Sequence, residues 1–466
     1  MKEDLIQKLH DLRVSNTLPM HMPGHKRNPT SAPYGIPYSS DITEIDGFDN
    51  LHSPEGVIRG IELKAASLWA ADEAFISVNG ATALIQSAIL SSTVRGDKIL
   101  IASNCHISVW HALEIGGLKP VIAEPGTKEE YPFVLQIDPE TIRTALRKDP
   151  DIRAVVITSP TYEGIMSDTA AIHKITSDAG VILIVDEAHG AHLGVKDQTL
   201  FPASASGDIV IKSVHKTLNA PTQTAVMLIR GDRADKRLIR HYLSINESTS
   251  PSYLLMAGLE HALNTADTDS LYKNARAGRD SLGKLEHLKL FACDGYDISK
   301  FVILTEGYIS GFDLADLLRK EFLIEIEAAF PTYIIAMTGT GDTAASIKRF
   351  TDAILAIDSS LSERIYAAGT SELKPVPRRS KLPVEKAVKS PSVSVTFDEA
   401  AGAVSAEYLF AYPPGIPLLI PGQEITEELI GIIEDMTAAG SSLKTEPCRT
   451  WDGTLLKVDT DARHKV

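Results

Sequence analysis

One lysine stands among hydroxyl and imidazole side chains in the segment SVHKTL (213–218). Lys216 follows the apolar run DIVIKSV (208–214), where a buried strand is expected to end. An amine at that place is either a solvated surface group or the group that holds an aldehyde cofactor. The residues that follow the other apolar runs have to decide between these two interpretations.

A second polar cluster follows the apolar run GVILIV (180–185). The run ends at Asp186 and continues as Glu187-Ala188-His189, with His192 close behind. Two acids at the end of an apolar strand need a buried partner. Either Asp186, His189 and His192 bind a divalent metal, or Asp186 pairs with a cationic ring nitrogen.

Two further runs end in groups that suit a phosphorylated ring. EAFISV (73–78) is followed by Asn79-Gly80-Ala81-Thr82 directly before a predicted helix, and the N–H groups of a helix N-terminus can cradle a phosphate. DKILIAS (97–103) is followed by His106, which serves either as a structural side chain or as a flat face against a ring.

Pyridoxal phosphate is the cofactor that uses all of these groups. A lysine forms a Schiff base with its aldehyde, a carboxylate keeps its ring nitrogen protonated, and hydroxyls with a helix N-terminus hold its phosphate. A metal site has no special use for Lys216. The shared position at strand ends therefore favours pyridoxal phosphate over a metal, and it predicts that Lys216 is buried.

The elements that must position these residues form an α/β fold. From about residue 60 to 230, short apolar runs alternate with helical patterns, which predicts a mostly parallel sheet buried on both faces. Ligands of such sheets bind beyond the carboxyl ends of the strands. The stretch 252–288 reads as helix, and a smaller α/β unit follows, with strands expected at 300–306, 323–330 and 333–339.

Three regions are expected along the chain. They are an N-terminal segment (1–60), a cofactor-binding large domain (61–285) and a small C-terminal α/β domain (286–466) with an exposed proline- and lysine-rich linker or loop at 371–391.

Composition excludes several classes of protein. The 466 residues carry a formal net charge of −15, so a basic nucleic-acid-binding surface is not expected. The longest apolar runs are too short to span a bilayer. The scattered cysteines (Cys105, Cys293 and Cys448) include no CxxC pair, which argues against zinc and suits the reducing cytoplasm.

At these residues the sequence resembles the Orn/Lys/Arg decarboxylase family, which are fold-type-I pyridoxal-phosphate enzymes. The resemblance covers nearly the whole chain. In length the chain is similar to the compact members of the family, which lack an N-terminal wing domain. The matching segments are HMPGHK (21–26), DITEIDGFDNLHSPEGVI (41–58), VNGATA (78–83), NCHISV (104–109), VDEAHGAH (185–192), SVHKTL (213–218), STSPSYLL (248–255) and YPPGIPLLIPG (412–422).

The resemblance implies a role for each candidate residue. Lys216 would be the Schiff-base lysine and Asp186 the partner of the ring nitrogen, with His106 and Ala188 on opposite ring faces. His189 would reach the ring hydroxyl or the substrate carboxylate, and Lys216 or His106 would return a proton to Cα. Residues near the phosphate would be Gly80, Ala81, Thr82, Ser213 and His215, with Thr249 and Ser250 reaching the neighbouring subunit's phosphate.

The chain also departs from the family pattern. Ala81 and Ala83 remove hydroxyls from the phosphate cradle, Ile107 replaces a common lysine, and Gln423 stands where a glutamate is usual. These departures bear on phosphate affinity and substrate choice.

The implied activity is decarboxylation of arginine, lysine or ornithine to agmatine, cadaverine or putrescine, as in polyamine biosynthesis. Glu327 would face the basic end of the substrate, although its alternation with Ile324 and Ile326 also fits the wet face of a strand. The resemblance implies a homodimer with shared active sites, or a tetramer. An aminotransferase or other lyase and a catalytically silent regulatory subunit are the alternatives.

The acidic segment TEIDGFDNLHSPEG (43–56) has its own pair of interpretations. Its spacing misses the EF-hand pattern of a calcium loop. The resemblance instead implies that it packs across the dimer at the site entrance.

Overall fold

The computed structural model describes most of the chain. The described residues are 4–15, 37–198, 200–364, 378–412, 415–438, 440–445, 449–450 and 456–460. The motif HMPGHK (21–26), Cys448 and part of the expected linker (371–377) lie outside them.

The largest sheet has seven strands in the order β1-β7-β6-β5-β4-β2-β3. The strands are β1 (Glu73–Ser77), β2 (Lys98–Ala102), β3 (Lys119–Ala123), β4 (Ile152–Thr158), β5 (Ile182–Asp186), β6 (Ile209–Ser213) and β7 (Ala225–Ile229). The pairs β2–β3, β2–β4 and β5–β6 are parallel, and β7 runs antiparallel to β1 and β6. The predicted mostly parallel α/β fold is thus confirmed.

Strand β7 is the one member of this sheet that the sequence pattern did not predict. It returns directly beside β6 after a tight turn, in which Gln223 has φ 77° and Thr224 hydrogen-bonds to the carbonyl of Pro221. Such a return needs no crossover helix. The helix–strand alternation that signals the parallel strands is therefore missing here.

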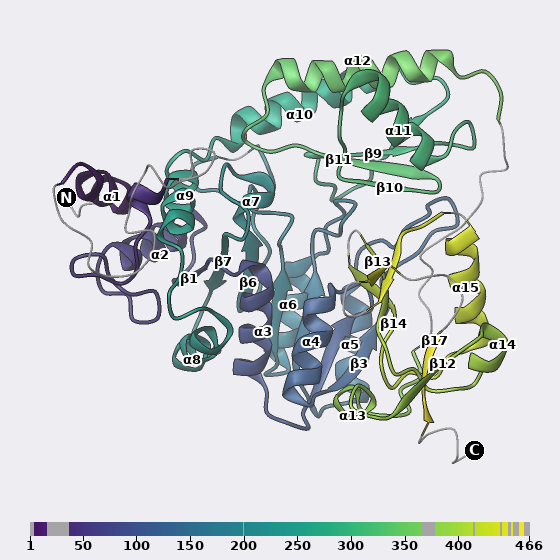
Figure 1. Cartoon of the computed structure of the whole chain (residues 1–466), viewed down its shortest axis with the longest axis horizontal. Coiled ribbons are helices and arrows are strands. Elements are labelled where there is room, and N and C mark those ends of the chain that lie inside the picture. Colours follow the sequence, from purple (N-terminus) through teal and green to yellow (C-terminus); the bar gives the residue numbers. More distant parts are fainter. Residues whose placement is uncertain are drawn as a thin grey trace. The chain divides into compact units, whose positions relative to one another are not determined.

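Helices flank these strands along the chain (Figure 1). They are α1 (Leu5–Val14), η3 (Tyr38–Ser40), α2 (Val57–Leu68), α3 (Gly80–Ser92), α4 (Ile107–Gly116), α5 (Pro139–Lys148), α6 (Thr169–Asp178), α7 (Val214–Thr217), α8 (Lys236–Asn246), α9 (Tyr253–Asn264) and α10 (Thr268–Leu282).

The stretch 252–288, predicted as helix, is not one continuous helix. It breaks into α9 and α10, and two side chains cap the start of α10: Asp267 accepts from the Ser270 N–H, and Gln198 accepts from the N–H groups of Thr268 and Asp269. The Asp267 cap is a local signal for a helix start, whereas the Gln198 cap comes from a distant part of the chain.

A second sheet has the order β10-β11-β9-β8. Its strands are β8 (Lys289–Leu290), β9 (Lys300–Leu304), β10 (Ala328–Phe330) and β11 (Tyr333–Met337), and its helices are α11 (Gly311–Phe322) and α12 (Ala344–Ser360). Alternate residues face opposite sides, as the two-residue period of a strand requires. Phe301 and Ile303 pack with α11 and α12, which lie on one side of the sheet, whereas Val302 and Leu304 pack with Phe133 and Tyr162 on the other (Figure 1).

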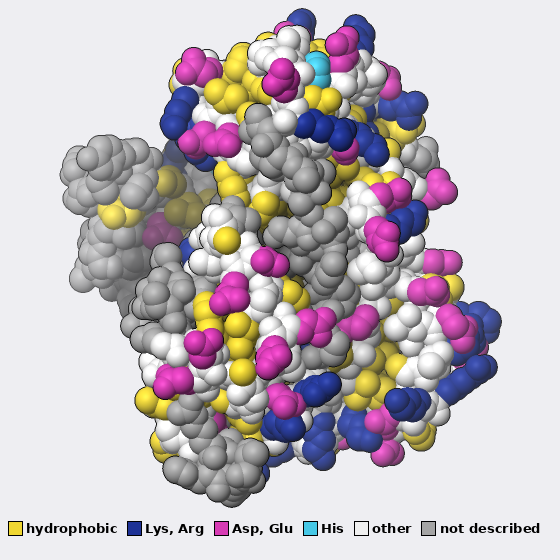
Figure 2. All heavy atoms as spheres, turned by 90° about the vertical axis from the view of Figure 1, so that its right-hand side faces the viewer, with side chains coloured by type: hydrophobic (Ala, Val, Ile, Leu, Met, Phe, Trp, Pro, Cys, Tyr) yellow, Lys and Arg dark blue, Asp and Glu magenta, His cyan; other side chains and the backbone are white. Residues whose placement is uncertain are grey.

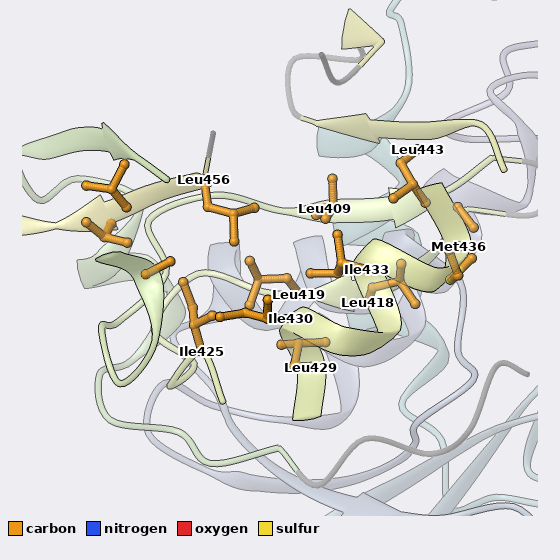
Figure 3. Close-up of a cluster of buried hydrophobic side chains, with 14 residues drawn as sticks. Leu409, Leu418, Leu419, Ile425, Leu429, Ile430, Ile433, Met436, Leu443 and Leu456 are labelled. Atoms are coloured by element: carbon orange, nitrogen blue, oxygen red, sulfur yellow. The ribbon is translucent and has the colours of Figure 1, made fainter. Parts of the chain in front are cut away.

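The C-terminal part forms its own apolar core (Figure 3). Leu429, Ile430, Ile433 and Met436 on one face of α15 pack against strand residues such as Leu419. The elements are α13 (Val384–Ala387), β12 (Ser392–Val395), α14 (Phe397–Ala400), β13 (Leu409–Ala411), β14 (Ile416–Leu419), α15 (Glu427–Ala438), β15 (Leu443–Thr445), β16 (Arg449–Thr450) and β17 (Leu456–Asp459).

The chain divides into two compact units. The first comprises residues 1–92, 182–271 and 339–341, and the second comprises 93–181, 272–338 and 342–466. Lys216, Asp186 and the start of α3 belong to the first unit, whereas His106 and Glu327 belong to the second. The expected domain boundaries near residues 60 and 285 stay a prediction.

Charge is mixed on the molecular face in Figure 2, where acidic and basic side chains are interspersed with apolar ones. The acidic excess is therefore not gathered into one patch on that face. Among the described residues, no helix is long and apolar enough to cross a membrane.

Candidate active site

Three strands of the first unit end at one edge of the sheet. Ala225 of β7 pairs with both Ser77 of β1 and Ser213 of β6, and Asp186 of β5 pairs with Ile211 of β6. The residues that follow β1, β5 and β6 are thereby brought together at the carboxyl ends of these strands, where ligands of such sheets bind.

Lys216 lies in α7, the short helix that directly follows β6 (Figure 1). Its side chain is half-buried rather than fully buried, and its Nζ is 2.9 Å from Nε2 of His189. Lys216 donates this hydrogen bond when His189 carries its own proton on Nδ1. Two predicted site residues, 27 positions apart in the chain, are thus in direct contact.

Ser213 and His215, the other candidate residues of SVHKTL, have structural surroundings. Ser213 is buried, and Nδ1 of His215 is 2.9 Å from the carbonyl of Thr224. Burial lowers the pKa of His215 against the raising effect of this hydrogen bond, and the nearby Lys216 cation lowers it further. A neutral His215 that donates through Nδ1 has only an acceptor at Nε2, so it is a poor donor to phosphate.

Asp186 is the last residue of β5 and is 4% exposed. Its Oδ1 accepts a hydrogen bond from the N–H of Ala188 (3.0 Å). Burial raises the pKa of Asp186, while the Lys216 cation and the Ala188 N–H oppose the rise. A cationic partner would compensate the buried carboxylate, and a protonated ring nitrogen has that charge.

The N-terminus of α3 is open, as a phosphate cradle requires. Gly80 has φ 74°, and a Cβ placed on it would have no atom within 4 Å. The N–H of Gly80 itself donates to Gln223 O (2.8 Å), which ties the helix start to the turn before β7. Ala81 is half-buried and Thr82 is exposed, so the first-turn N–H groups and the Thr82 hydroxyl are the groups that remain for a phosphate.

Thr249 and Ser250 are exposed, and the residues directly before them in the chain are anchored by two contacts. The carbonyl of Asn246 accepts a hydrogen bond from the Asn79 side chain (2.9 Å), and the carbonyl of Ser248 lies 2.8 Å from Nε2 of His52. Asn79 directly precedes the α3 N-terminus, so this segment is fastened beside the cradle of its own chain.

His106 lies in the second unit and caps α4. Its Nδ1 accepts a hydrogen bond from the Ser108 N–H (3.2 Å) and lies 2.9 Å from the Ser108 hydroxyl. The other ring edge faces Gly415, on which a Cβ would come within 3.3 Å of His106 Nε2. His106 therefore has the hydrogen bonds of a structural side chain at the start of α4. Its stacking on a cofactor ring stays a prediction.

Glu327 also lies in the second unit, directly before β10 and not within a strand as expected. The predicted strand 323–330 shortens to Ala328–Phe330 because Leu323 adopts φ 55° at the end of α11. Glu327 is exposed and accepts a hydrogen bond from the hydroxyl of Tyr162 (3.0 Å). It lines a cavity of about 430 Å³, together with Met337, Thr338 and Asp342.

Several of the acidic residues and histidines considered for a metal have other neighbours in the fold. In the described part of the chain, no three His, Cys, Asp or Glu side chains are placed to share a metal ion. His192 packs edge-on against Phe201.

In the acidic segment 43–56, Asp49 accepts hydrogen bonds from five backbone N–H groups, those of Asn50, Glu55, Gly56, Ile58 and Arg59. Its carboxylate organises the start of α2.

The sequence analysis missed two residues that support this site, Lys212 and Thr340. Glu187 has a buried ion-pair partner in Lys212, which lies inside β6. The one available signal was a lysine within an otherwise apolar run. Thr340 donates its N–H to the carbonyl of Thr217 (2.8 Å), and no local pattern could reveal that contact.

The fold is that of the fold-type-I pyridoxal-phosphate enzymes, as comparison with solved structures shows. The solved structure of a Francisella novicida lysine decarboxylase matches 98% of this chain and 81% of its own, with TM-score 0.81 and 20% identity. The constitutive lysine decarboxylase of E. coli matches 97% of this chain and 81% of its own, with TM-score 0.80 and 16% identity.

Sequence comparison identifies the family within this class. The Orn/Lys/Arg decarboxylase major domain matches residues 4–290, and the C-terminal domain of the same family matches residues 363–447. An arginine decarboxylase of Bacillus subtilis (strain 168) is 30% identical over 444 residues, which are 90% of each chain. An arginine decarboxylase of Halalkalibacterium halodurans is 30% identical over 455 residues, which are 91% of each chain.

The chain belongs to the Orn/Lys/Arg decarboxylase family, and it is a decarboxylase of the pyridoxal-phosphate-dependent class. The resemblance inferred from the sequence motifs is confirmed.

Proposed function

We propose that this chain binds pyridoxal phosphate at Lys216 and decarboxylates arginine, lysine or ornithine to the corresponding amine. The contact between Lys216 Nζ and His189 Nε2 (2.9 Å), beside the buried carboxylate of Asp186, is the observation that carries the proposal. Arginine is the first substrate to test, because relatives that match nine-tenths of the chain are named arginine decarboxylases.

The residues present fit the cofactor. Lys216 supplies the amine, Asp186 supplies a buried negative charge for the ring nitrogen, and the open start of α3 has room for the phosphate beside Gly80. Ala188, held by its N–H on Asp186, would pack on one face of the ring and His106 on the other. Ala81, Thr82, Ser213 and the turn at His215 would surround the phosphate.

When bound, pyridoxal phosphate takes up the substrate amine at its aldehyde carbon and accepts the electrons that the departing carboxyl group leaves behind. The protein has to keep the ring nitrogen charged, and Asp186 does this from a site with little water. It also has to move a proton. Lys216 Nζ holds one, and His189 is close enough to exchange it.

Selectivity for a basic side chain would come from Glu327. The hydroxyl of Tyr162 donates to its carboxylate, which fixes the direction of the negative charge. Burial raises the pKa of Tyr162, and the Glu327 carboxylate raises it further, so Tyr162 stays a donor. A guanidinium or ammonium group is the natural partner for a carboxylate oriented in this way.

The assay offers arginine, lysine and ornithine in parallel to the purified protein with pyridoxal phosphate. Carbon dioxide release with agmatine, cadaverine or putrescine as product identifies both reaction and substrate. A keto acid without carbon dioxide would favour an aminotransferase, and no turnover of any substrate would favour a silent regulatory subunit.

We further propose a homodimer, or a tetramer built from it, in which Thr249 and Ser250 complete the partner's site. Both side chains are exposed in the single chain. Mixing Lys216→Ala with a Thr249→Arg/Ser250→Arg variant, each inactive alone, should then restore about a quarter of the wild-type activity through one intact site in each mixed dimer. No restoration would argue against shared sites.

A cytoplasmic location fits the free cysteines Cys105 and Cys293.

A further inference from the structure

A second lysine lies four residues before Lys216 and points into the protein. Lys212 is the second-last residue of β6 and is 0% exposed. Its Nζ contacts Glu187 Oε2 (2.6 Å) and the carbonyl oxygens of Gly190 (2.7 Å) and Leu193 (3.2 Å). An ammonium group has three protons, so each of these acceptors can receive one.

All three contacts of Lys212 lie in one short loop, residues 187–193, which follows Asp186. A third carbonyl of this loop, that of Ala191, accepts a hydrogen bond from Nε1 of Trp69 (3.2 Å). The ring of Trp69 is itself 5.4 Å from the Lys212 ammonium. Lys212 and Trp69 thus hold three of the loop's seven carbonyl groups from within the protein.

The acidic partner is equally constrained. Glu187 is 1% exposed, and its carboxylate accepts hydrogen bonds from the Ser204 hydroxyl (2.7 Å) and the Ala205 N–H (2.9 Å). A charge that is both paired and hydrogen-bonded tolerates burial, but such a pair is often no more stabilising than apolar side chains of the same size. Stability alone therefore does not account for a charged pair at this position.

The loop 187–193 lies outside the helices and strands. Its own backbone bonds are few: the Glu187 N–H donates to Ile211 O of β6 (2.8 Å), and two turn bonds join Gly190 to Glu187 and Leu193 to Gly190. It nevertheless carries Ala188 and His189, and it directly follows Asp186, the last residue of β5. The Lys212 contacts to the Glu187 carboxylate and the Gly190 carbonyl flank His189 in the chain. Lys212 therefore restrains the loop on both sides of His189, and with it the contact to Lys216.

We propose that Lys212 is a positioning residue of the active site, which holds the 187–193 loop so that Asp186, Ala188 and His189 keep their places around Lys216. This inference rests on the proposed cofactor role of Lys216. Lys212 acts through backbone carbonyls and does not itself touch the cofactor or substrate.

The test compares two double variants that differ only in a hydrogen-bond donor. Lys212→Met/Glu187→Gln removes both charges and the donor, whereas Lys212→Gln/Glu187→Gln removes both charges and keeps an amide N–H for the loop. Cofactor affinity is measured by titrating the apo-proteins with pyridoxal phosphate, and thermal stability is measured in parallel. The absorbance of the bound cofactor is followed against pH.

We expect the Met variant to bind pyridoxal phosphate about tenfold more weakly, with a shifted pH profile of absorbance. The Gln variant should recover most of this affinity at a similar melting temperature. Equal affinity and equal pH profiles of wild type and both variants would overturn the inference, as would losses that follow the melting temperature alone.

A control separates positioning from general destabilisation. Asp208 precedes the opposite end of β6, is 2% exposed, and accepts a two-point contact from Arg233 (2.8 and 2.7 Å). Arg233→Met should lower the melting temperature and leave cofactor affinity within about twofold of wild type, because this pair does not touch the loop.

The wild-type arm tests the proposed function separately. Borohydride reduction followed by mass spectrometry should find the cofactor on Lys216. If the wild type carries no cofactor there, the proposed function fails; if it does and the variants bind equally well, only the role of Lys212 fails.

Discussion

Two buried regions of this chain differ in what their interiors contain. At the ends of β5 and β6, the interior holds the charged side chains of Asp186, Glu187 and Lys212, each at most 4% exposed. Under α15, the interior consists of fourteen buried apolar residues, from Val395 to Val458 (Figure 3).

The difference follows from what each region has to do. Burying a charge is unfavourable unless partners compensate it, whereas burying hydrocarbon stabilises a fold directly. A region that supports a fold can therefore be wholly apolar. A region that handles protons and a charged cofactor has to keep its charges and surround them with fixed partners.

The largest effect is expected at Lys216. Lys216→Ala removes the amine that we assign to the cofactor, so activity should fall at least about a thousandfold, or about 4 kcal/mol of transition-state stabilisation. Stability should change little, since the side chain is only half-buried. The exposed Lys196→Ala is the matched control in the decarboxylation assay. Retained activity in Lys216→Ala would contradict the assignment.

Asp186→Asn sharpens the comparison, because activity and stability should respond differently. Without a carboxylate the ring nitrogen loses its charge partner, and we expect turnover to fall about a hundredfold, or roughly 3 kcal/mol. Burial already disfavours the charged form of Asp186 in the cofactor-free chain, so the apo-protein should not be less stable. Turnover assays and denaturant titrations of the apo-protein measure the two effects. A parallel loss of both would contradict the proposed role.

In the apolar region the opposite pattern is expected. Ile433→Ala removes a fully buried side chain of α15, and the lost burial and the remaining cavity should lower the free energy of unfolding by roughly 2 to 3 kcal/mol. Activity per folded molecule should be unchanged. Val393→Ala, at a side chain that is 42% exposed, should cost under about 0.5 kcal/mol. Urea unfolding and active-site titration distinguish these outcomes.

Glu247 offers a pH-dependent comparison. It is 7% exposed, and burial raises its pKa to about 7, although the Ser77 hydroxyl, the Val78 N–H and the Arg240 cation act to lower it. The folded chain therefore binds more protons than the unfolded chain between the ordinary pKa of 4.5 and pH 7, so this group's contribution to stability falls as pH rises through that window.

Glu247→Gln removes the buried charge. It should raise the free energy of unfolding at pH 8 by about 1 to 2 kcal/mol and leave it unchanged below pH 4.5. Denaturant titrations at both pH values measure this, with the exposed Glu321→Gln as control. A gain of the same size at both pH values would show that the charge is not the cause.

The smallest effect is expected at an exposed ion pair. Arg319 contacts Asp316 and Glu325, but all three side chains are about half exposed or more. Solvent screens such contacts, so Arg319→Ala should change the free energy of unfolding far less than Ile433→Ala does, and less still at high salt. A loss as large as that of Ile433→Ala would contradict the contrast between exposed and buried contacts.

Much of the fold was predictable because its signals are local. Apolar runs followed by polar residues located β5, β6 and the start of α3 to within a few residues. The same patterns failed at β7 and at the break between α9 and α10. At β7 the apolar run Ala225–Ile229 is a local strand signal, but its place beside β1 and β6 depends on the long-range pairing of Ala225 with Ser77 and Ser213. At the helix break the Asp267 cap is local, and only the second cap, from Gln198, is long-range.

By itself, the sequence determined the family, the mostly parallel α/β fold and the candidate residues Lys216, Asp186 and His189. The types of these residues and their positions at strand ends can be recognised from short stretches of consecutive residues. Only the tertiary structure decided which groups touch. The contact between Lys216 and His189 and the pairing of Lys212 with Glu187 join residues that are 27 and 25 positions apart. Such contacts depend on how neighbouring strands align and on which charges burial leaves uncompensated, and neither property belongs to any single stretch of sequence.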